Sequence, residues 1–304
     1  MRIGVVDVDT SHPENWIPIE RELGHDVVGV WDGGSVHPTG YAAEFAQKLE
    51  IPRVFDSIEQ MVPEVDCAII HGCDWDTHVE KARPFVEAGK AVLVDKPIAG
   101  NARDLAQFVE WAGQGARIAG GSSLRFCYEI QAFFNTPVEE RGTPHAILCG
   151  CAVDEFNYGI HAYSMLSGLM GPGMASVRHL GDNVQQHFQV KWADGRSGFL
   201  NVGAAAKWLP FYATVATEQA VHHIPGCQDL YRALLEAVLP YLAGEADAPL
   251  PMEQLLEPEW CALAARISRQ EGGREVTLAE AKEADGGYDG AEFAEGYRKA
   301  KYPS

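Results

Sequence analysis

A group of polar residues follows the first apolar run of the chain, where a strand is expected to lead into a helix. The group contains Asp7, Asp9, Thr10, Ser11 and His12. Two hydroxyls and an imidazole at a helix N-terminus could bind phosphate, because the helix dipole favours an anion there. On the G-x-G-x-x-G template of dinucleotide-binding turns, however, Asp7, Asp9 and His12 occupy the glycine positions, and carboxylates there repel a diphosphate unless they are turned away. The alternative interpretation of Asp9, Thr10 and Ser11 is an ordinary helix N-cap.

Two further residues stand at the ends of later apolar runs. Asp32 follows the second run, where an acidic side chain can bind ribose hydroxyls. A carboxylate there disfavours a 2′-phosphate, which predicts NAD as the cofactor rather than NADP. Lys96 follows another run, within Asp95-Lys96-Pro97, and would be held on a stiff turn because proline restricts the residue before it. The alternative for Lys96 is a surface lysine beside a loop.

The elements that would position these residues alternate between short strands and amphipathic helices over residues 1–120. This alternation predicts an α/β fold: a parallel sheet covered on both faces, with right-handed, doubly wound, Rossmann-type topology. Ligands of such sheets bind beyond the carboxyl ends of the strands, where Asp9, Asp32 and Lys96 would lie. Six strands are expected, over residues 3–8, 26–31, 53–55, 65–71, 91–94 and 117–119.

The pattern changes in residues 121–304, which we expect to form a second domain. Longer runs of alternating polar and apolar residues, with the hairpin signal Asp194-Gly195, predict an α+β domain with a large, mostly antiparallel sheet. Strands are expected over residues 145–153, 175–180, 184–192, 197–206 and 211–216. Helices are expected over residues 128–134, 161–169, 229–242, 252–269 and 291–299.

The motifs between Tyr41 and Pro97 resemble those of the glucose–fructose oxidoreductase / inositol dehydrogenase / MocA (Gfo/Idh/MocA) family. The most specific match is Asp95-Lys96-Pro97, although members usually have glutamate where this chain has Asp95. The resemblance covers nearly the whole chain. Its other segments are Phe55–Glu59, Val65–Ile70, Asp76-Thr77-His78, Glu87–Lys90, Arg125-Phe126, Tyr158–His161 and Leu230–Ala237.

This resemblance implies an NAD(P)-dependent oxidoreductase that moves a hydride between a carbinol carbon of a sugar, cyclitol or related polyol and nicotinamide C4. It implies that Lys96 orients the reacting hydroxyl and that His161 exchanges the proton, a role suited to a group that titrates near neutrality. The aspartate that members carry four residues before this histidine is replaced by Asn157. Asn157 can orient the ring but adds no negative charge, which predicts a weaker base or a different proton route.

The resemblance also places the remaining candidate residues around two ligands. The cofactor side comprises Asp9, Thr10, Ser11, His12, Asp32, Trp75, His78, Asp95 and Lys96, with His78 mostly shaping the pocket. The substrate side comprises Arg125, Tyr128, Tyr158 and His161. A divergent member without redox chemistry, serving as a sugar-binding or partner protein, is the alternative favoured by Asp7, Asp9 and Asn157.

Some cysteines and histidines raise the question of a metal site. Cys149 and Cys151 share one face of an expected strand, so a metal or redox pair is conceivable, but small buried apolar residues are the favoured interpretation. The late histidines (His187, His222 and His223) have no carboxylate or cysteine at ligand spacing, and we interpret them as part of a polar sheet face or subunit contact. The sequence therefore predicts no metal site.

The overall charge limits the partners of the chain. The 304 residues include 24 basic and 43 acidic side chains, a net charge of −19. Such a surface repels nucleic acid and anionic lipid, so neither is expected as a partner. The start lacks a secretory signal, and no run is long enough to span a bilayer, which predicts a cytoplasmic protein. A homodimer or homotetramer is expected from the resemblance, because family members usually pair the polar faces of their second-domain sheets.

Overall fold

The structure, a computed structural model, describes residues 1–303, which form two compact units. The first unit contains Met1–Gly121, Leu235–Met252 and the chain from Asp289 onward; the second contains Ser122–Leu234 and Glu253–Tyr288. The boundary expected at residue 120 lies beside the first crossing between units. The two later returns of the chain to the first unit were not expected from the sequence.

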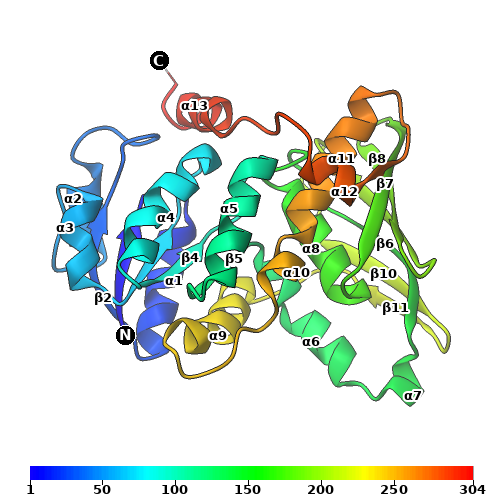
Figure 1. The fold of residues 1–304 in the computed structure, drawn as a ribbon, viewed down its shortest axis with the longest axis horizontal. Coiled ribbons are helices and arrows are strands. Elements are labelled where there is room, and N and C mark those ends of the chain that lie inside the picture. The colour runs from blue at the N-terminus through cyan, green and yellow to red at the C-terminus, as the bar shows by residue number, and fades with distance from the viewer. Residues whose placement is uncertain (304) are drawn as a thin grey trace. The chain divides into compact units, whose positions relative to one another are not determined.

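The first unit is built on a parallel sheet in the order β2-β1-β3-β4-β5 (Figure 1). Its central strands are almost fully buried on both faces, which explains their continuous runs of valine, isoleucine and leucine. The doubly wound fold expected from the sequence is thereby confirmed. The strands are β1 (Arg2–Val6), β2 (Asp26–Trp31), β3 (Cys67–Ile70), β4 (Ala91–Val94) and β5 (Ile118–Gly120).

Five strands are present in this sheet where six were expected. The segment at 53–55 forms only an isolated parallel bridge between Val30 and Val54. The chain turns away at once, because Ser57 caps a short helix by accepting a hydrogen bond from the Gln60 N–H.

Helices connect the strands of the first unit, and a late helix returns to it. The helices between strands are α1 (His12–Glu22), α2 (Tyr41–Lys48), α3 (Ile58–Met61), α4 (His78–Glu87) and α5 (Ala102–Gly113), with 3₁₀ turns η1 (Val62–Glu64) and η2 (Trp75–Thr77). The late helix α13 (Gly290–Lys301) contacts η2, the turn that leads into α4. Part of α9 (Leu230–Leu242) also belongs to this unit.

The second unit is built on a seven-stranded sheet in the order β11-β10-β6-β9-β8-β7-β12. Only β6 and β9 pair in parallel within this part of the described chain, so the prediction of a mostly antiparallel sheet is confirmed. The strands are β6 (Pro144–Gly150), β7 (Met174–Asp182), β8 (Gln186–Trp192), β9 (Ser197–Val202), β10 (Tyr212–Thr217), β11 (Val221–Ile224) and β12 (Val276–Thr277).

The hairpin between β8 and β9 turns at Asp194-Gly195 as expected, with Gly195 at a φ of +93°. Along β8, Phe188 and Val190 are buried while the intervening residues are partly exposed. The expected strand start at Val184 is wrong, since this side chain is 66% exposed and the strand begins at Gln186. The short strands β11 and β12 were missed.

The buried helix α8 (Gly159–Met170) lies at the centre of the second unit and contacts β6, β9, η3 and α11. The helix expected over residues 252–269 is interrupted at Leu256 and forms two helices. These and the remaining helices are η3 (Ser123–Arg125), α6 (Tyr128–Asn135), α7 (Val138–Arg141), α10 (Met252–Leu255), α11 (Glu257–Gln270) and α12 (Leu278–Lys282).

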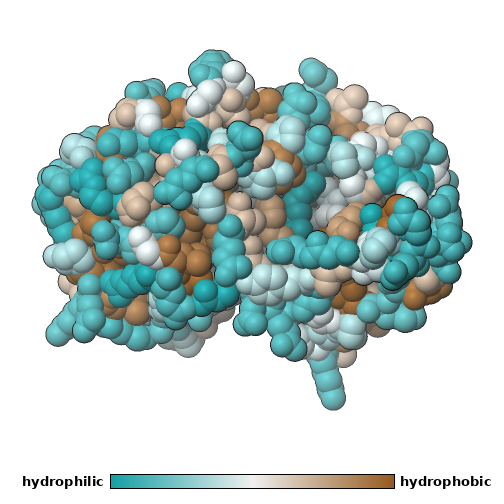
Figure 2. Space-filling view, turned by 90° about the horizontal axis from the view of Figure 1, so that it is seen from below, coloured by the Kyte–Doolittle hydropathy of each residue, from teal (hydrophilic) through white to brown (hydrophobic). Residues whose placement is uncertain are grey.

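The face drawn in Figure 2 is mostly hydrophilic, with smaller hydrophobic areas between the polar side chains. Within residues 1–303, no helix has the length and apolar character that crossing a bilayer requires.

Candidate functional site

Asp7 stands at the end of β1 with a φ of +65°, the left-handed conformation that a dinucleotide turn normally assigns to glycine. Its side chain is fully buried. One carboxylate oxygen lies 2.5 Å from the Lys81 ammonium, and the other accepts a hydrogen bond of 2.9 Å from the Gly33 N–H. The carboxylate is therefore turned into the unit and its charge is compensated by Lys81. In this position it avoids the clash with a diphosphate that the sequence led us to expect.

Asp9 is also fully buried, and its Oδ2 accepts a hydrogen bond of 2.9 Å from the Cys73 N–H. Its Oδ1 has no hydrogen-bond partner among the described residues. Burial, together with the nearby charge of Asp7, raises the pKa of Asp9 to about 7. Asp9 is thus a carboxyl that titrates near neutral pH at the position where a dinucleotide turn brings backbone against the diphosphate.

Asp95, directly after β4, is shared by two imidazoles. Its Oδ2 lies 2.6 Å from His12 Nδ1 and 3.0 Å from His71 Nδ1. Burial by itself would raise the pKa of Asp95, but the charges and hydrogen bonds of His12 and His71 hold it well below the usual range. Trp16 of α1 packs against both imidazole rings. The side chains of His12, Asp95 and His71 form a fixed network at the carboxyl edge of the sheet.

The two histidines of this network differ in access. The His71 side chain is completely buried, and burial lowers its pKa, whereas the His12 side chain is 14% exposed. His12 is therefore the member that a solute can reach, oriented by a carboxylate as in general acid–base sites. His71 was missed from the sequence, where it reads as the last residue of an apolar run; its only signal was its place at a strand end.

Lys96 follows this network directly. Its backbone N–H donates a hydrogen bond of 2.7 Å to Asp95 Oδ1, and its peptide bond to Pro97 is cis. The residue is partly exposed, while Asp95 and Pro97 on either side are buried. The lysine is thus held at the edge expected from the sequence.

The other expected cofactor residues take different positions. His78 is completely buried, with its ring nitrogens 3.0 Å from the Ile98 carbonyl and 2.8 Å from the Gly72 carbonyl. Both partners are acceptors, so a neutral ring, which has a single N–H, donates to only one of them. Asp32 follows β2, and burial raises the pKa of its carboxyl. Thr10 Oγ1 accepts the His12 N–H, whereas the Ser11 side chain makes no capping hydrogen bond.

The C-terminal helix α13 covers the loops that follow β2 and β3. Ala294 forms a buried cluster with Val36 and Cys73, against which Phe293 and Tyr297 also pack. The Phe293 ring packs at a tilt on Trp75, one of the expected cofactor residues, with 5.1 Å between the ring centroids. The N-terminus of α13 is fixed to the same loop, because the Gly290 N–H donates to Asp76 Oδ2 at 2.8 Å.

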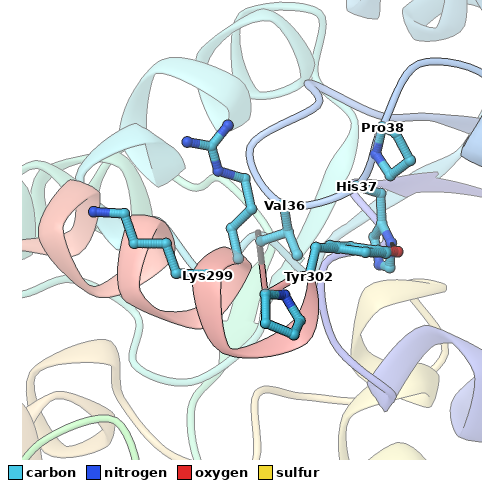
Figure 3. Close-up of a pocket in the computed structure, with 7 residues that line it drawn as sticks. Val36, His37, Pro38, Lys299 and Tyr302 are labelled. Atoms are coloured by element: carbon cyan, nitrogen blue, oxygen red, sulfur yellow. Dashed lines mark hydrogen bonds between the residues drawn. The ribbon is translucent and has the colours of Figure 1, made fainter.

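The end of α13 reaches the β1 turn. Lys301 Nζ lies 3.3 Å from the Asp9 carbonyl oxygen and 3.2 Å from His37 Nε2, and the Tyr302 hydroxyl lies 2.7 Å from His37 Nδ1. Figure 3 shows Tyr302 and His37 side by side at one wall of a cavity of about 740 Å³. The cavity is lined by Val36, His37, Pro38, Arg298, Lys299, Tyr302 and Pro303.

A dinucleotide fits one half of this edge and not the other. Around β4, the Lys96 side chain and the His12 imidazole are partly exposed and can face a reacting group. The adenosine half would lie between the loops after β2 and β3, where Ala294 and Phe293 now pack, and the glycines that admit a diphosphate are absent. A complete dinucleotide therefore requires α13 to move away from the loops after β2 and β3.

The second unit contributes a separate group around His161, which is 6% exposed on α8. Its Nδ1 lies 2.7 Å from Ser122 Oγ, which also accepts the Leu124 N–H. Tyr158 and Phe211 place their rings 5.4 Å and 5.0 Å from the imidazole. Ser122 and Phe211 were missed from the sequence, because a serine in a Gly-Gly-Ser-Ser run and a phenylalanine after a loop carry no pattern of their own.

The remaining expected substrate residues lie close by in sequence and fold. Arg125 is in η3, which packs against α8, and burial lowers the pKa of its guanidinium to about 10. Tyr128 is the first residue of α6, and Asn157 and Tyr158 directly precede α8. Asp154 Oδ1 accepts the backbone N–H groups of Phe156 and Tyr158, which fixes the turn that carries them. Lys96 and His161 belong to different units, and their meeting stays a prediction.

The residues weighed as metal ligands have other contacts. Cys149 and Cys151 are buried free thiols, placed against the carbonyl oxygens of Ala162 and Tyr158. The late histidines hydrogen-bond to neighbouring elements. His187 pairs with Asn201 of β9, His222 with the Arg141 carbonyl of α7 and His223 with Thr214 of β10.

Comparison with known proteins identifies the first unit. Residues 1–119 match the Gfo/Idh/MocA family model, described as an oxidoreductase family with an NAD-binding Rossmann fold. Residues 1–119 thus belong to the Gfo/Idh/MocA oxidoreductase family. The resemblance noted in the sequence is thereby confirmed.

One curated relative of this Gfo/Idh/MocA unit is trans-1,2-dihydrobenzene-1,2-diol dehydrogenase of Danio rerio. The two are 34% identical over 111 residues, which is 36% of this chain and 31% of the relative. The chain thus spans about a third of the length of the curated relatives it matches.

Solved structures of two dehydrogenases share the fold of both units. Myo-inositol dehydrogenase of Lactobacillus casei, in complex with NAD(H) and myo-inositol, aligns with a TM-score of 0.77 at 14% identity, over 91% of this chain and 96% of that one. UDP-N-acetylglucosamine 3-dehydrogenase of Acidithiobacillus ferrooxidans aligns with a TM-score of 0.73 at 18% identity, over 88% and 97%. These relatives and neighbours are dehydrogenases.

Proposed function

We propose that the protein is an oxidoreductase that acts on a hydroxyl-bearing carbon of a sugar, cyclitol or related polyol. The observation that carries this proposal is Lys96, held beside the His12–Asp95–His71 network at the carboxyl edge of a Gfo/Idh/MocA sheet. An ammonium group there stabilises the negative charge that develops on an alcohol oxygen as it loses its proton. The inositol complex of a protein with the same fold supports the substrate class.

In this proposal, different residues orient the substrate and accept its proton. Lys96 orients the substrate hydroxyl, and His161 accepts its proton, with the imidazole positioned by Ser122 and enclosed by Tyr158 and Phe211. The acceptor of the hydride is a nicotinamide dinucleotide, with NAD preferred over NADP because the Asp32 carboxylate follows β2. In this proposal α13 moves away when the dinucleotide binds.

A second candidate function is favoured by the position of α13, which covers the loops after β2 and β3. Helix α13 contacts Val36, Cys73 and Asp9, on the loops where the adenosine half of a dinucleotide would lie. A chain that keeps α13 there permanently would be a non-redox member of the family, binding a sugar-like ligand or a partner protein.

Direct titration separates the two candidates. We expect NADH to bind saturably to the full chain and NADPH to bind more weakly. Binding is measured by calorimetry and by the fluorescence of the seven tryptophans. An Asp32→Ala variant should narrow that preference, while the exposed Glu44→Ala should leave it unchanged. If neither dinucleotide binds at millimolar concentration, the redox function is lost and the second candidate stands.

A further inference from the structure

Two cysteines that are far apart in the sequence meet in the second unit. The Sγ atoms of Cys127 and Cys227 are 3.6 Å apart, although 100 residues separate them. Cys127 directly precedes α6, and Cys227 lies in the loop between β11 and α9. A disulfide bond is about 2.05 Å long, so these thiols touch without being bonded.

A carboxylate completes the group. Glu129, in the first turn of α6, accepts a hydrogen bond of 3.0 Å from the Gln228 N–H through Oε1. Its other oxygen, Oε2, is buried and has no hydrogen-bond partner among residues 1–303. Ligand atoms of Cys127, Glu129 and Cys227 lie within 4.8 Å of one another. A buried carboxylate oxygen without a partner costs free energy, which a bound cation would recover.

The spacing of these atoms agrees with tetrahedral zinc. Zinc binds thiolate sulfur at about 2.3 Å and carboxylate oxygen at about 2.1 Å. At the tetrahedral angle these bond lengths separate two sulfur ligands by about 3.8 Å, and a sulfur from an oxygen ligand by about 3.6 Å. The observed separation of 3.6 Å between the two sulfurs therefore needs little adjustment to accept the ion.

We propose that Cys127, Glu129 and Cys227 form a binding site for one thiophilic divalent cation of the Zn²⁺ type. Two thiolates favour Zn²⁺ over Mg²⁺ or Ca²⁺, which prefer oxygen ligands. Glu129 and Cys227 are partly exposed, so a cation can enter from solvent. Three protein ligands leave a fourth position for water or a solute. The site would tie the start of α6, and with it Tyr128, to the loop before α9.

Zinc titration of the reduced full chain, in competition with a chromogenic chelator, tests this site. We expect one Zn²⁺ per chain, with affinity lost in Cys127→Ser and Cys227→Ser and weakened about tenfold or more in Glu129→Gln. Cys261→Ala removes a buried thiol of α11 and is the matched control, expected to bind as the wild type does. The proposal is overturned if the wild type does not bind Zn²⁺ tightly. It is also overturned if a variant that carries both Cys127→Ser and Cys227→Ser binds Zn²⁺ as the wild type does.

A second measurement needs no variant and so does not depend on folding of the mutants. Zn²⁺ should protect Cys227, the partly exposed member of the pair, from alkylation, as read by peptide mass spectrometry. Co²⁺ should give a thiolate-to-cobalt charge-transfer band in the near ultraviolet. If glutathione disulfide instead oxidises the two thiols to a disulfide, and Cys227 of the reduced chain stays open to alkylation in Zn²⁺, the pair is a dithiol and the metal site is wrong.

Discussion

At the scale of single residues, the candidate site depends on how buried charges are compensated. Asp7 is paired with Lys81, and Asp95 is shared by His12 and His71, so each buried carboxylate has close partners inside the unit. The sequence indicated Asp95, Lys96 and His161 through motifs. It could not indicate His71, Ser122 or Phe211, because a single residue at a strand end or in a loop gains its role only from a partner distant in sequence.

Unlike Asp95, Glu20 of α1 is a buried carboxyl that favours its protonated form. It is fully buried, and neither of its oxygens has a hydrogen-bond partner in the described chain, so burial raises its pKa to about 8. Between pH 4.5 and 8 the unfolded chain releases this proton while the folded chain keeps it, and the stability present at low pH is lost as the pH rises. We expect Glu20→Gln to flatten the pH dependence of the melting temperature over this range, recovering on the order of a few kcal/mol at pH 8.5.

The exposed Glu44→Gln is the control for this measurement and should leave the pH dependence of stability as it is. A wild-type melting temperature that does not fall between pH 5 and pH 8.5, or falls equally in Glu20→Gln, would contradict the assignment of Glu20.

At the scale of elements, local pattern predicted most of the strands and helices and failed where tertiary contacts decide. Alternating and continuous apolar runs found the five strands of the first sheet, but the bridge at Val54 looked like a sixth. The amphipathic pattern of 291–299 predicted a helix. It could not predict that α13 packs on the loops after β2 and β3, because amphipathicity indicates a buried face and not what covers it.

The position of α13 leads to a prediction about cofactor affinity. Ala294 is 4% exposed in the cluster with Val36 and Cys73. A buried charge in Ala294→Glu should loosen α13, and because α13 and a dinucleotide compete for one place, we expect NADH to bind several-fold more tightly, as measured by calorimetry. Glu295→Ala, on the exposed face of the same helix, should not change the affinity. Equal or weaker binding by Ala294→Glu, with the melting temperature showing a folded chain, would mean that α13 does not oppose the cofactor.

At the scale of the whole molecule, the second-unit sheet presents a face away from α8. On this face Leu148 of β6 and Phe199 of β9 are paired in register and are 42% and 40% exposed. Large apolar side chains side by side on a sheet are typical of a protein interface. We propose that copies of this chain associate through this face, as expected from the resemblance. The proposal predicts a mass in light scattering of two or four times 33.2 kDa.

Phe199→Glu should convert that assembly to a monomer, since a charge would be buried without a partner in the interface. Val184→Glu, at a hydrophobic side chain 66% exposed in the β7–β8 turn, should leave the mass unchanged. A monomeric wild-type chain, or an unchanged mass in Phe199→Glu, would contradict this assembly.

The most direct test of the proposed function is polyol-dependent reduction of NAD⁺, followed by the absorbance of NADH over a panel of cyclitols and sugars. We predict turnover of at least one polyol, a loss of about a hundredfold or more in Lys96→Ala, and no loss in Lys90→Ala, which changes a lysine at the opposite end of β4. Turnover that survives in Lys96→Ala at the wild-type rate would contradict the role given to Lys96 and with it the account of this site.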